Sequence, residues 1–411
     1  MEDVQITPTA EDSDELTISA SMRETIKSSS WIRQMFEEGA RLKQRFGRDN
    51  VFDFTLGNPS VPPPPAFFEI LQKVARESDA ADHRYMNNTG LESVREKIAG
   101  RLSAEHGLKV TAQSVVMTCG AAGALNILLK SILDPGDEIM VLTPYFPEYL
   151  FYIANHGGVP CLVDTDDNFQ PDPSRIAEAL TSKTRAIIIN TPNNPTGVVY
   201  TQEMVNAIGE VIDGHSATHG RNTYLILDEP YHRIRYTDEP HPSIFEATPN
   251  GVLITSYSKD LGLAGERIGY VALHPELLGL GDMFSALSIA TRVLGFVNAP
   301  AFMQRVVAEC GGLAVDVAAY RRNRDRLYTA LQKIGFEMAD PDGSFFLFPK
   351  APGGDDIQFC SQLKKHRVLC VPGRGFGREG YIRISYAVPP EVIERAIPLF
   401  EQAFRSTASG A

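Results

Sequence analysis

The sequence predicts an α/β protein with a largely parallel sheet, followed by a smaller α+β unit. The first observation is that short apolar runs alternate with helical stretches from about residue 66 to residue 290. The second is a change of pattern near residue 315, where a long charged helix leads into short strands and a terminal helix. Strands that alternate with helices are typical of parallel sheets, and a chain of 411 residues is long enough for two domains.

The N-terminal region divides into a tail, a helix and a proline-rich connection. Residues 1–28 are polar and acidic, which predicts a disordered tail. In the next segment, Trp31, Met35 and Leu42 fall near helical spacing and predict an amphipathic helix. A short strand follows in VFDFTLG. Pro62–Pro65 then predict a stiff connector, because proline fixes its own backbone angle and lacks an N–H donor.

Apolar runs predict the strands of both units. Those of the first unit carry little polar alternation, which is typical of strands that are covered on both faces. In chain order they are SVVMTC, EIMVLT, RAIIIN, TYLILD, GVLITS and RIGYVAL, and the runs of the C-terminal unit are FFLF, VLCV and YIRISYA.

Composition excludes several classes of function. The net charge is −12 and no basic run occurs, so we expect no nucleic-acid partner. The five cysteines lack CxxC spacing, which favours a reduced intracellular protein without a metal site. The sequence has no secretory signal and no apolar stretch of about 18 residues. A cytoplasmic protein with no membrane partner is therefore expected.

The segment SYSKDLGLAGERIGY predicts a lysine that forms a Schiff base. Lys259 follows a predicted strand, and nucleophilic lysines form such bonds with carbonyl groups, including cofactor aldehydes. Ser256, Ser258 and Arg267 are hydroxyl and cationic partners for a phosphate. Taken alone, a lysine at this place is more often a surface residue.

The segment LILDEPYHR places an aspartate at the end of an apolar strand. Open α/β sheets bind ligands at the carboxyl edge of their strands. Asp228 can there keep a ring nitrogen of a cofactor protonated, and Tyr231 can hydrogen-bond an oxygen of the same ring. The alternative is a capping aspartate in a turn before Pro230.

Two loops that follow strands add further candidates. In NTPNNPTG, tight turns allow Asn194 to point toward a cofactor or a substrate carboxylate. In CGAAGAL, the small residues Gly120, Ala121 and Ala122 let backbone N–H groups approach a phosphate at a helix N-terminus. Turn chemistry and close helix–sheet packing explain the two loops equally well when each is taken alone.

Six motifs occur in an order that resembles one enzyme family. They are GNP, Y-x4-G-x4-R, NNPTG, D-x-x-Y, SxSK-x7-R and RIS, and the resemblance extends from about residue 30 to the C-terminus. The set is similar to that of fold-type I aminotransferases of class I/II, the aspartate aminotransferase type, which depend on pyridoxal 5'-phosphate (PLP). The resemblance implies a large domain with a mainly parallel seven-stranded sheet, a smaller α+β domain, PLP as cofactor and a homodimer.

The resemblance also assigns roles around the cofactor. It implies that Lys259 binds PLP and moves the proton, and that Asp228 pairs with the pyridine nitrogen. Tyr231 and Asn194 match the residues that contact the 3-oxygen of the ring, and Asn194 also reaches the substrate.

Further roles concern the walls of the site. An aromatic ring in TPYFPEY is implied to stack on the cofactor; Phe146 fits this place best, and Tyr145 is the runner-up. Arg383 in YIRIS matches the arginine that binds the substrate carboxylate, although a salt bridge within the small domain would also explain it. Gly57 in LGNP resembles the segment that closes over substrate.

The resemblance implies a role for one residue at the dimer interface and for another in recognising the substrate side chain. Tyr85 matches a tyrosine that reaches the phosphate in the partner subunit, whereas its pattern alone indicates an ordinary loop aromatic. Arg292 lies in a segment where family members often select the substrate side chain, and an arginine there would favour a dicarboxylic substrate.

The implied reaction moves an amino group from an α-amino acid to a 2-oxo acid, with 2-oxoglutarate as the expected acceptor, in two ping-pong half-reactions through the Schiff base of Lys259. A PLP-dependent lyase or synthase of the same fold is the alternative. A transcription regulator with an aminotransferase-like domain is a further one, but it needs a DNA-binding module, and only about 30 residues precede the domain. The expected division is residues 29–62 as a helix and a segment joining the small domain, 63–300 as the large PLP-binding domain and 301–411 as the small domain.

Overall fold

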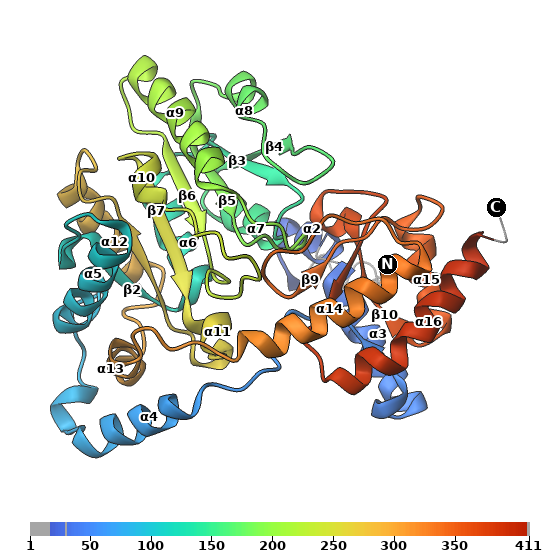
Figure 1. Ribbon diagram of the computed structural model, residues 1–411. Coiled ribbons are helices and arrows are strands. Elements are labelled where there is room, and N and C mark those ends of the chain that lie inside the picture. Colours follow the sequence, from blue (N-terminus) through green and yellow to red (C-terminus); the bar gives the residue numbers. More distant parts are fainter. Residues whose placement is uncertain (1–16, 29–30, 409–411) are drawn as a thin grey trace, which may run out of the picture.

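A computed structural model describes residues 17–28 and 31–408 of the chain (Figure 1). Within these residues, seven strands form the sheet of a large domain, in the order β2-β8-β7-β6-β5-β3-β4. Neighbouring strands are parallel except at β8, which is antiparallel to both β2 and β7. The predicted fold class, an α/β protein with a mainly parallel seven-stranded sheet, is thereby confirmed. The strands are β2 (Val115–Thr118), β3 (Glu138–Thr143), β4 (Val159–Asp164), β5 (Thr184–Asn190), β6 (Tyr224–Asp228), β7 (Gly251–Ser256) and β8 (Gly269–Leu273).

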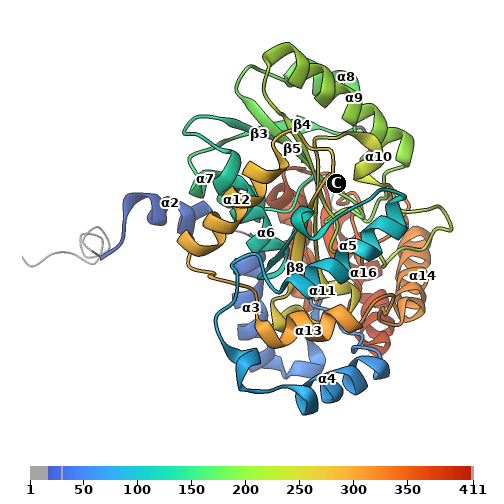
Figure 2. The same ribbon diagram turned by 90° about the vertical axis from the view of Figure 1, so that its left-hand side faces the viewer.

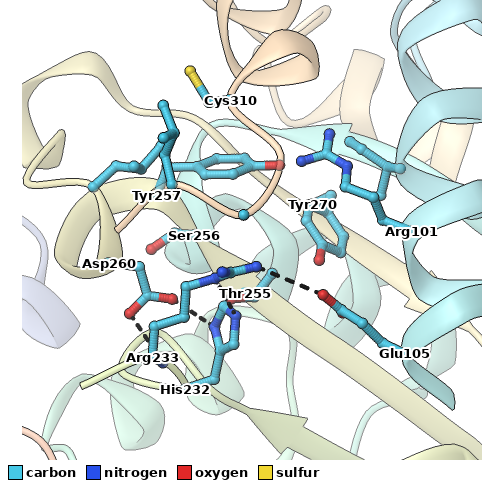
Figure 3. A pocket seen from close by; sticks show the side chains of 14 residues that line it. Arg101, Glu105, His232, Arg233, Thr255, Ser256, Tyr257, Asp260, Tyr270 and Cys310 are labelled. Carbon is cyan, nitrogen blue, oxygen red and sulfur yellow. Dashed lines mark hydrogen bonds and ion pairs between the residues drawn. The ribbon is translucent and has the colours of Figure 1, made fainter. Parts of the chain in front are cut away.

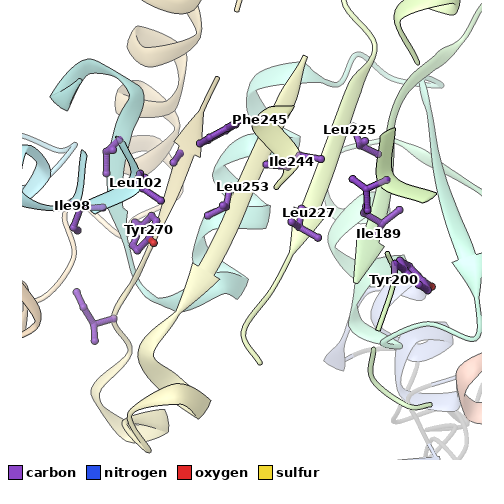
Figure 4. Close-up of a cluster of buried hydrophobic side chains, with 14 of the residues drawn as sticks. Ile98, Leu102, Ile189, Tyr200, Leu225, Leu227, Ile244, Phe245, Leu253 and Tyr270 are labelled. Carbon is purple, nitrogen blue, oxygen red and sulfur yellow. The ribbon is translucent and has the colours of Figure 1, made fainter. Parts of the chain in front are cut away.

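Helices cover both faces of this sheet, which explains why its strands are apolar on both sides. Side chains alternate along each strand. In β3, Ile139 and Val141 pack on one face, and Met140 and Leu142 pack on the other. Figure 4 shows the second face, where side chains of α5 and α10 meet those of β6, β7 and β8. The helices on this face are α5 (Glu92–His106), α8 (Pro173–Ala179), α9 (Gln202–His219) and α10 (Ile244–Ala247), and those on the other are α6 (Gly120–Ile132), α7 (Glu148–Asn155) and α12 (Leu280–Val293).

The small domain lies beside the large one and has its own core (Figure 1). Its antiparallel sheet has the order β11-β12-β9, and a second pair joins β1 to β10 in parallel. Because β1 comes from the N-terminal region, the chain enters the small domain before it forms the large one. The elements are β1 (Phe52–Asp53), β9 (Phe346–Leu347), β10 (Val368–Leu369), β11 (Val371–Pro372), β12 (Ile382–Ser385), α3 (Trp31–Phe46), α14 (Val317–Ile334), α15 (Asp356–Lys365) and α16 (Pro390–Ala408).

Two parts of the chain differ from the expected division. Helix α2 (Ala20–Ser28) lies in the region where a disordered tail is expected, so that prediction is wrong for these residues, while residues 1–16 of the tail lie outside the described residues. Helix α13 (Ala301–Glu309) packs beside α4 (Pro65–Glu77) and α5 in the core of the large domain, not in the small one (Figure 2). The proline run leads into helix α4: Pro64 precedes the helix, and Pro65, the last of the four prolines, is its first residue.

The carboxyl ends of the central strands meet at one edge of the sheet. Asn190 at the end of β5 is the register partner of Asp228 at the end of β6. Strand β7 ends beside them at Ser256 and continues directly into the one-turn helix α11 (Tyr257–Asp260). Residues of the motifs NTPNNPTG, LILDEPYHR and SYSKDLGLAGERIGY therefore lie together at this edge. In the part of the chain that is described, no helix is long and apolar enough to cross a membrane.

Candidate active site

A pocket opens at this edge of the sheet, where the two domains meet. Residues of both domains line it, because Phe346 and Arg383 come from the small domain and the other lining residues come mostly from the large one. The residues predicted from the sequence that line the pocket are Gly57, Ala121, Ala122, Phe146, Asn194, Asp228, Tyr231, Ser256, Ser258, Lys259, Arg267 and Arg383.

Lys259 projects into the pocket from the one-turn helix that follows β7. Its Nζ donates a hydrogen bond to the backbone oxygen of Gly57 over 2.6 Å. Burial, together with the nearby charges of Arg383 and Arg267, lowers the pKa of Lys259 to about 8. An amine with this pKa loses its proton readily near neutral pH, so it can act as a nucleophile and as a base.

Asp228 is buried at the end of β6 and is 5% exposed. One carboxylate oxygen accepts a hydrogen bond from the hydroxyl of Tyr149, while the other has no hydrogen-bond partner among the described residues. The pKa of Asp228 is raised to about 7: burial is the main cause and the charge of Glu229 contributes, while the hydrogen bond from Tyr149 acts in the opposite direction. A buried carboxylate with a free oxygen is the partner that a cationic ring nitrogen requires.

Small and cationic residues form the end of the pocket beside α6. Gly120 begins α6 with a φ of +73°, a conformation that suits glycine. A Cβ there would lie 3.1 Å from Nη2 of Arg267, so a side chain would crowd the guanidinium. The free N–H groups of the first turn of α6, the hydroxyls of Ser256 and Ser258, and Arg267 together can bind a phosphate.

Arg383 is held in a fixed orientation on β12. Its Nη1 donates to Oδ1 of Asn194 over 2.9 Å, and its Nη2 donates to the backbone oxygen of Thr55 over 2.6 Å. The guanidinium lies between the rings of Phe346 and Phe376, 4.5 Å from each centroid. Burial lowers the pKa of Arg383 to about 10, so it still carries its charge at neutral pH. A carboxylate that enters the pocket can therefore pair with it.

Four of the other candidates do not line this pocket, and one of them, Gly120, directly precedes the lining residues Ala121 and Ala122. Tyr85 is 91% exposed and does not line the pocket of its own chain. Arg292 is exposed near the end of α12. Tyr145 packs against Gly377 and its N–H donates to the backbone oxygen of Phe376 over 3.0 Å, whereas the neighbouring Phe146 lines the pocket.

Several residues of the pocket were missed in the sequence. Glu148 lines it, burial raises the pKa of its carboxyl, and Oε2 has no hydrogen-bond partner among the described residues. Tyr149 and Tyr152 come from the same helix, α7. Asn190 donates to the backbone oxygen of Asp228 over 2.7 Å. One signal could have indicated Glu148, Tyr149 and Tyr152: they lie close together on the helix that follows TPYFP.

The groups in the pocket fit a phosphorylated pyridine aldehyde. The unpaired oxygen of Asp228 suits a protonated ring nitrogen, and the first turn of α6 with Arg267 suits a phosphate. Between them, Phe146 offers an aromatic face, and the amine of Lys259 can bind an aldehyde.

Comparisons with known proteins agree with this geometry. Residues 49–399 match the family described as "Aminotransferase class I and II". The chain is 33% identical to a probable aspartate aminotransferase of Methanocaldococcus jannaschii, over 82% of this chain and 89% of that protein. It is also 33% identical to the aspartate/prephenate aminotransferase of Thermus thermophilus, over 84% of this chain and 89% of that protein.

Solved structures are similar over almost the whole chain. An aminotransferase of Eubacterium rectale superimposes with a TM-score of 0.91 at 36% identity, covering 95% of this chain and 99% of that one. The aspartate aminotransferase of Thermotoga maritima gives a TM-score of 0.83 at 29% identity, covering 94% of this chain and 100% of that one. The chain therefore belongs to the class I and II aminotransferases, a family of PLP-dependent enzymes, and transfers amino groups.

Proposed function

We propose that this aminotransferase binds PLP through a Schiff base with Lys259, and that Asp228 holds the pyridine nitrogen protonated. The observation that supports this most directly is the buried carboxylate of Asp228, which has one oxygen without a hydrogen-bond partner among the described residues. A buried carboxyl group of this kind either takes up a proton or pairs with a cation. The N-terminus of α6, Ser256, Ser258 and Arg267 then bind the phosphate.

The residues around the pyridine ring have different roles in the proposed reaction. When bound, PLP supplies an aldehyde that takes up the amino group and a ring that accepts the electrons left when the Cα proton departs. Lys259, once its amine is free, takes that proton from Cα, a transfer typically worth about 10²–10⁴-fold in rate. Tyr231 and Asn194 hydrogen-bond the 3-oxygen, and Phe146 stacks on the ring.

The substrates are an α-amino acid and a 2-oxo acid, and 2-oxoglutarate is the proposed acceptor. Arg383 binds the α-carboxylate of both substrates, because its guanidinium is already oriented by Asn194 and Thr55. The segment at Gly57, whose backbone oxygen accepts from Lys259, lies over the substrate. Relatives named aspartate aminotransferases support a dicarboxylic donor, for which Arg292 would have to act from the partner subunit.

We further propose that the enzyme is a homodimer that shares its active sites. Tyr85 is 91% exposed in the single chain, although its motif is the one that contacts the cofactor phosphate in the family it resembles. Two exposed apolar residues of α12, Ile289 and Val293, are available to a second subunit. The cytoplasmic location stays a prediction.

Borohydride reduction tests the cofactor proposal. The purified enzyme should absorb in the visible region, and reduction should fix the cofactor to the peptide that holds Lys259. A label on any other lysine would contradict the assignment. A screen of amino acids for formation of the aminated cofactor, followed by analysis of products, then identifies the donor; an oxo acid indicates transamination, whereas pyruvate with ammonia indicates the lyase reaction, which the comparisons do not favour.

A further inference from the structure

Three residues of the proposed cofactor site are each followed in the chain by a titratable residue that faces another cavity. The first member of each pair lines the pocket described above, and the second lines one or both of two neighbouring cavities. None of the second members has a role in the proposed reaction. The pairs are Asp228 and Glu229, Tyr231 and His232, and Lys259 and Asp260.

Two of these second members form an ion pair with each other. His232 Nδ1 lies 2.6 Å from Oδ2 of Asp260, a carboxylate that is 2% exposed (Figure 3). The backbone N–H of Arg233 also donates to Oδ1 of Asp260 over 3.4 Å, so both oxygens of the carboxylate have partners. The guanidinium of Arg233 extends in turn to Glu105, with Nη2 3.6 Å from Oε1.

His232 holds a proton on Nδ1 in either charge state. Burial disfavours the charged imidazole, but Asp260 and Glu229 outweigh it and raise the pKa of His232 to about 9. The structure also places Nε of Arg233 as a donor to Nε2 of His232 over 3.2 Å. This hydrogen bond requires a neutral imidazole, because Nε2 of the charged ring carries a proton and cannot accept. With Nε2 as acceptor, the neutral ring carries its proton on Nδ1. The protonated Nδ1 therefore faces the carboxylate of Asp260 in both forms.

This ion pair connects two chain segments that are proposed to hold the cofactor. Tyr231 and His232 belong to the connection after β6, and Lys259 and Asp260 belong to α11. Helix α11 has a single turn of four residues, and a helix of this length has little stability of its own. Its orientation must therefore be imposed from outside, and the side chain of Asp260 is one point where this happens.

The backbone of α11 supplies a second connection. The carbonyl oxygen of Asp260 accepts a hydrogen bond over 2.8 Å from the N–H of Val315. Val315 belongs to the core of the small domain and lies two residues before helix α14. Asp260 is thus held at its side chain by the large domain and at its backbone by the chain that leads into the small one.

We propose that the His232–Asp260 pair positions Lys259 relative to Tyr231, and so sets the placement of the lysine amine against the ring that both residues contact. This rests on the proposed function of Lys259. The pair acts through geometry, since neither member lines the cofactor pocket. A misplacement of about 1 Å at a reacting group costs on the order of 10²-fold in rate, so a loss of this size is expected in kcat.

The test compares Asp260→Asn and His232→Leu with the wild-type holoenzyme. Both variants should lower kcat by about 10- to 100-fold and leave KM nearly unchanged, because Arg383 still binds the substrate carboxylate. They should also shift the midpoint of the pH titration of the cofactor's visible absorbance. In the apoprotein, they should slow recombination with PLP and change its pH dependence, which reports the reactivity of the lysine directly.

A matched pair in the same region provides the control. His241 Nε2 lies 2.8 Å from Oε2 of Glu229, which is also buried. Both residues belong to the connection after β6, and among the described residues no hydrogen bond or ion pair joins either of them to α11. His241→Leu should lower the melting temperature as the His232 variant does, and should leave the absorbance titration and the recombination rate unchanged. The proposal is wrong if the control shifts both readouts equally, or if the test variants shift neither.

A conservative variant keeps the proposal testable if His232→Leu does not fold. In His232→Asn, the side-chain amide can donate to Asp260 from nearly the position of Nδ1 without carrying a charge. It should retain the wild-type absorbance titration and most of kcat; loss of both in a folded His232→Asn protein would overturn the positioning role. Borohydride mapping separates this result from failure of the proposed function, because a label on another lysine refutes the role of Lys259 itself.

Discussion

Tyr149 donates its hydroxyl hydrogen to one oxygen of the Asp228 carboxylate and so orients the carboxylate that we assign to the pyridine nitrogen. The other oxygen of Asp228 has no partner among the described residues and remains available for the ring. Both side chains are buried, so little water competes with this contact. Tyr149 thus acts on the cofactor through Asp228.

Tyr149→Phe should weaken PLP binding and lower kcat. Removing the hydroxyl leaves a buried carboxylate oxygen unsatisfied, which costs about 1–3 kcal/mol, or roughly 5- to 150-fold in an equilibrium constant. PLP affinity is measured by titration of the apoprotein. Tyr152→Phe is the matched control, since Tyr152 lines the same pocket but has no hydrogen bond to Asp228; equal losses in the two variants would contradict the role of Tyr149.

Asp228→Asn should reduce turnover by several orders of magnitude and reduce cofactor content much less. The amide has nearly the size of the carboxylate but no charge, so it cannot stabilise a protonated ring nitrogen. The phosphate contacts at α6 and Arg267 are unchanged, and they keep PLP bound. Single-turnover rates and the absorbance of the bound cofactor check this; a variant that turns over near the wild-type rate would rule out the electronic role.

Lys259 should make the stability of the apoprotein depend on pH. Burial lowers its pKa from 10.5 to about 8, so below pH 8 the folded protein contains a buried charge. Between pH 8 and 10.5 the unfolded chain binds the extra proton, and stability rises with pH. Lys259→Met should therefore be more stable at pH 7 by roughly 3 kcal/mol.

The advantage of Lys259→Met should shrink as the pH rises through this window. Denaturant unfolding of both apoproteins at several pH values measures the difference. Lys183→Met removes an exposed lysine and serves as the control. A constant difference from pH 7 to 10.5 would mean that the Lys259 amine is not destabilised in the folded protein.

The parts of the site that the sequence predicts are those that follow strands. Asn194, Asp228 and Lys259 each come within a few residues of the end of a parallel strand, and such ends gather at one edge of a sheet. Their proximity follows from the alternating pattern alone, as does the mainly parallel sheet. The reversed direction of β8 does not, because an apolar run carries no information on the direction of its strand.

The missed residues depend on tertiary geometry. Glu148 and Tyr149 face the pocket because α7 begins at Glu148, and a shift of one residue in that start would turn them elsewhere. Phe346 reaches the pocket from the other domain, where it packs on Arg383. The roles proposed for Tyr85 and Arg292 require a second subunit, and the sequence around these residues does not indicate where that subunit would lie.

Mixed dimers test the role of Tyr85. Subunits that carry Lys259→Ala and subunits that carry Tyr85→Phe should each be impaired alone. If Tyr85 serves the partner's phosphate, a mixed dimer has one site with both residues intact, and part of the activity returns on mixing. Subunit exchange is verified with differently tagged chains. Proven heterodimers without recovered activity would place Tyr85 outside the active site.

Arg383→Lys should lower kcat/KM for every amino acid and every oxo acid. Lysine keeps the charge but loses the planar fork, which here donates to Asn194 and Thr55 and lies between two aromatic rings. Breaking the pairing of a buried charge costs about 3–5 kcal/mol, so a loss of on the order of 10²- to 10³-fold is expected.

Cofactor content distinguishes this role from a general disturbance of the site. Arg383 is not assigned a contact with PLP itself, and Asn194 is its one hydrogen-bond partner among the residues assigned to the cofactor. Because the phosphate contacts, Asp228 and Lys259 are unchanged, Arg383→Lys should keep nearly the wild-type cofactor content. Arg322→Lys, on the exposed side of α14, is the control for the substitution itself. A loss confined to dicarboxylic substrates would assign Arg383 to the substrate side chain, and the α-carboxylate would then need another cation, for which Arg292 is the first to test.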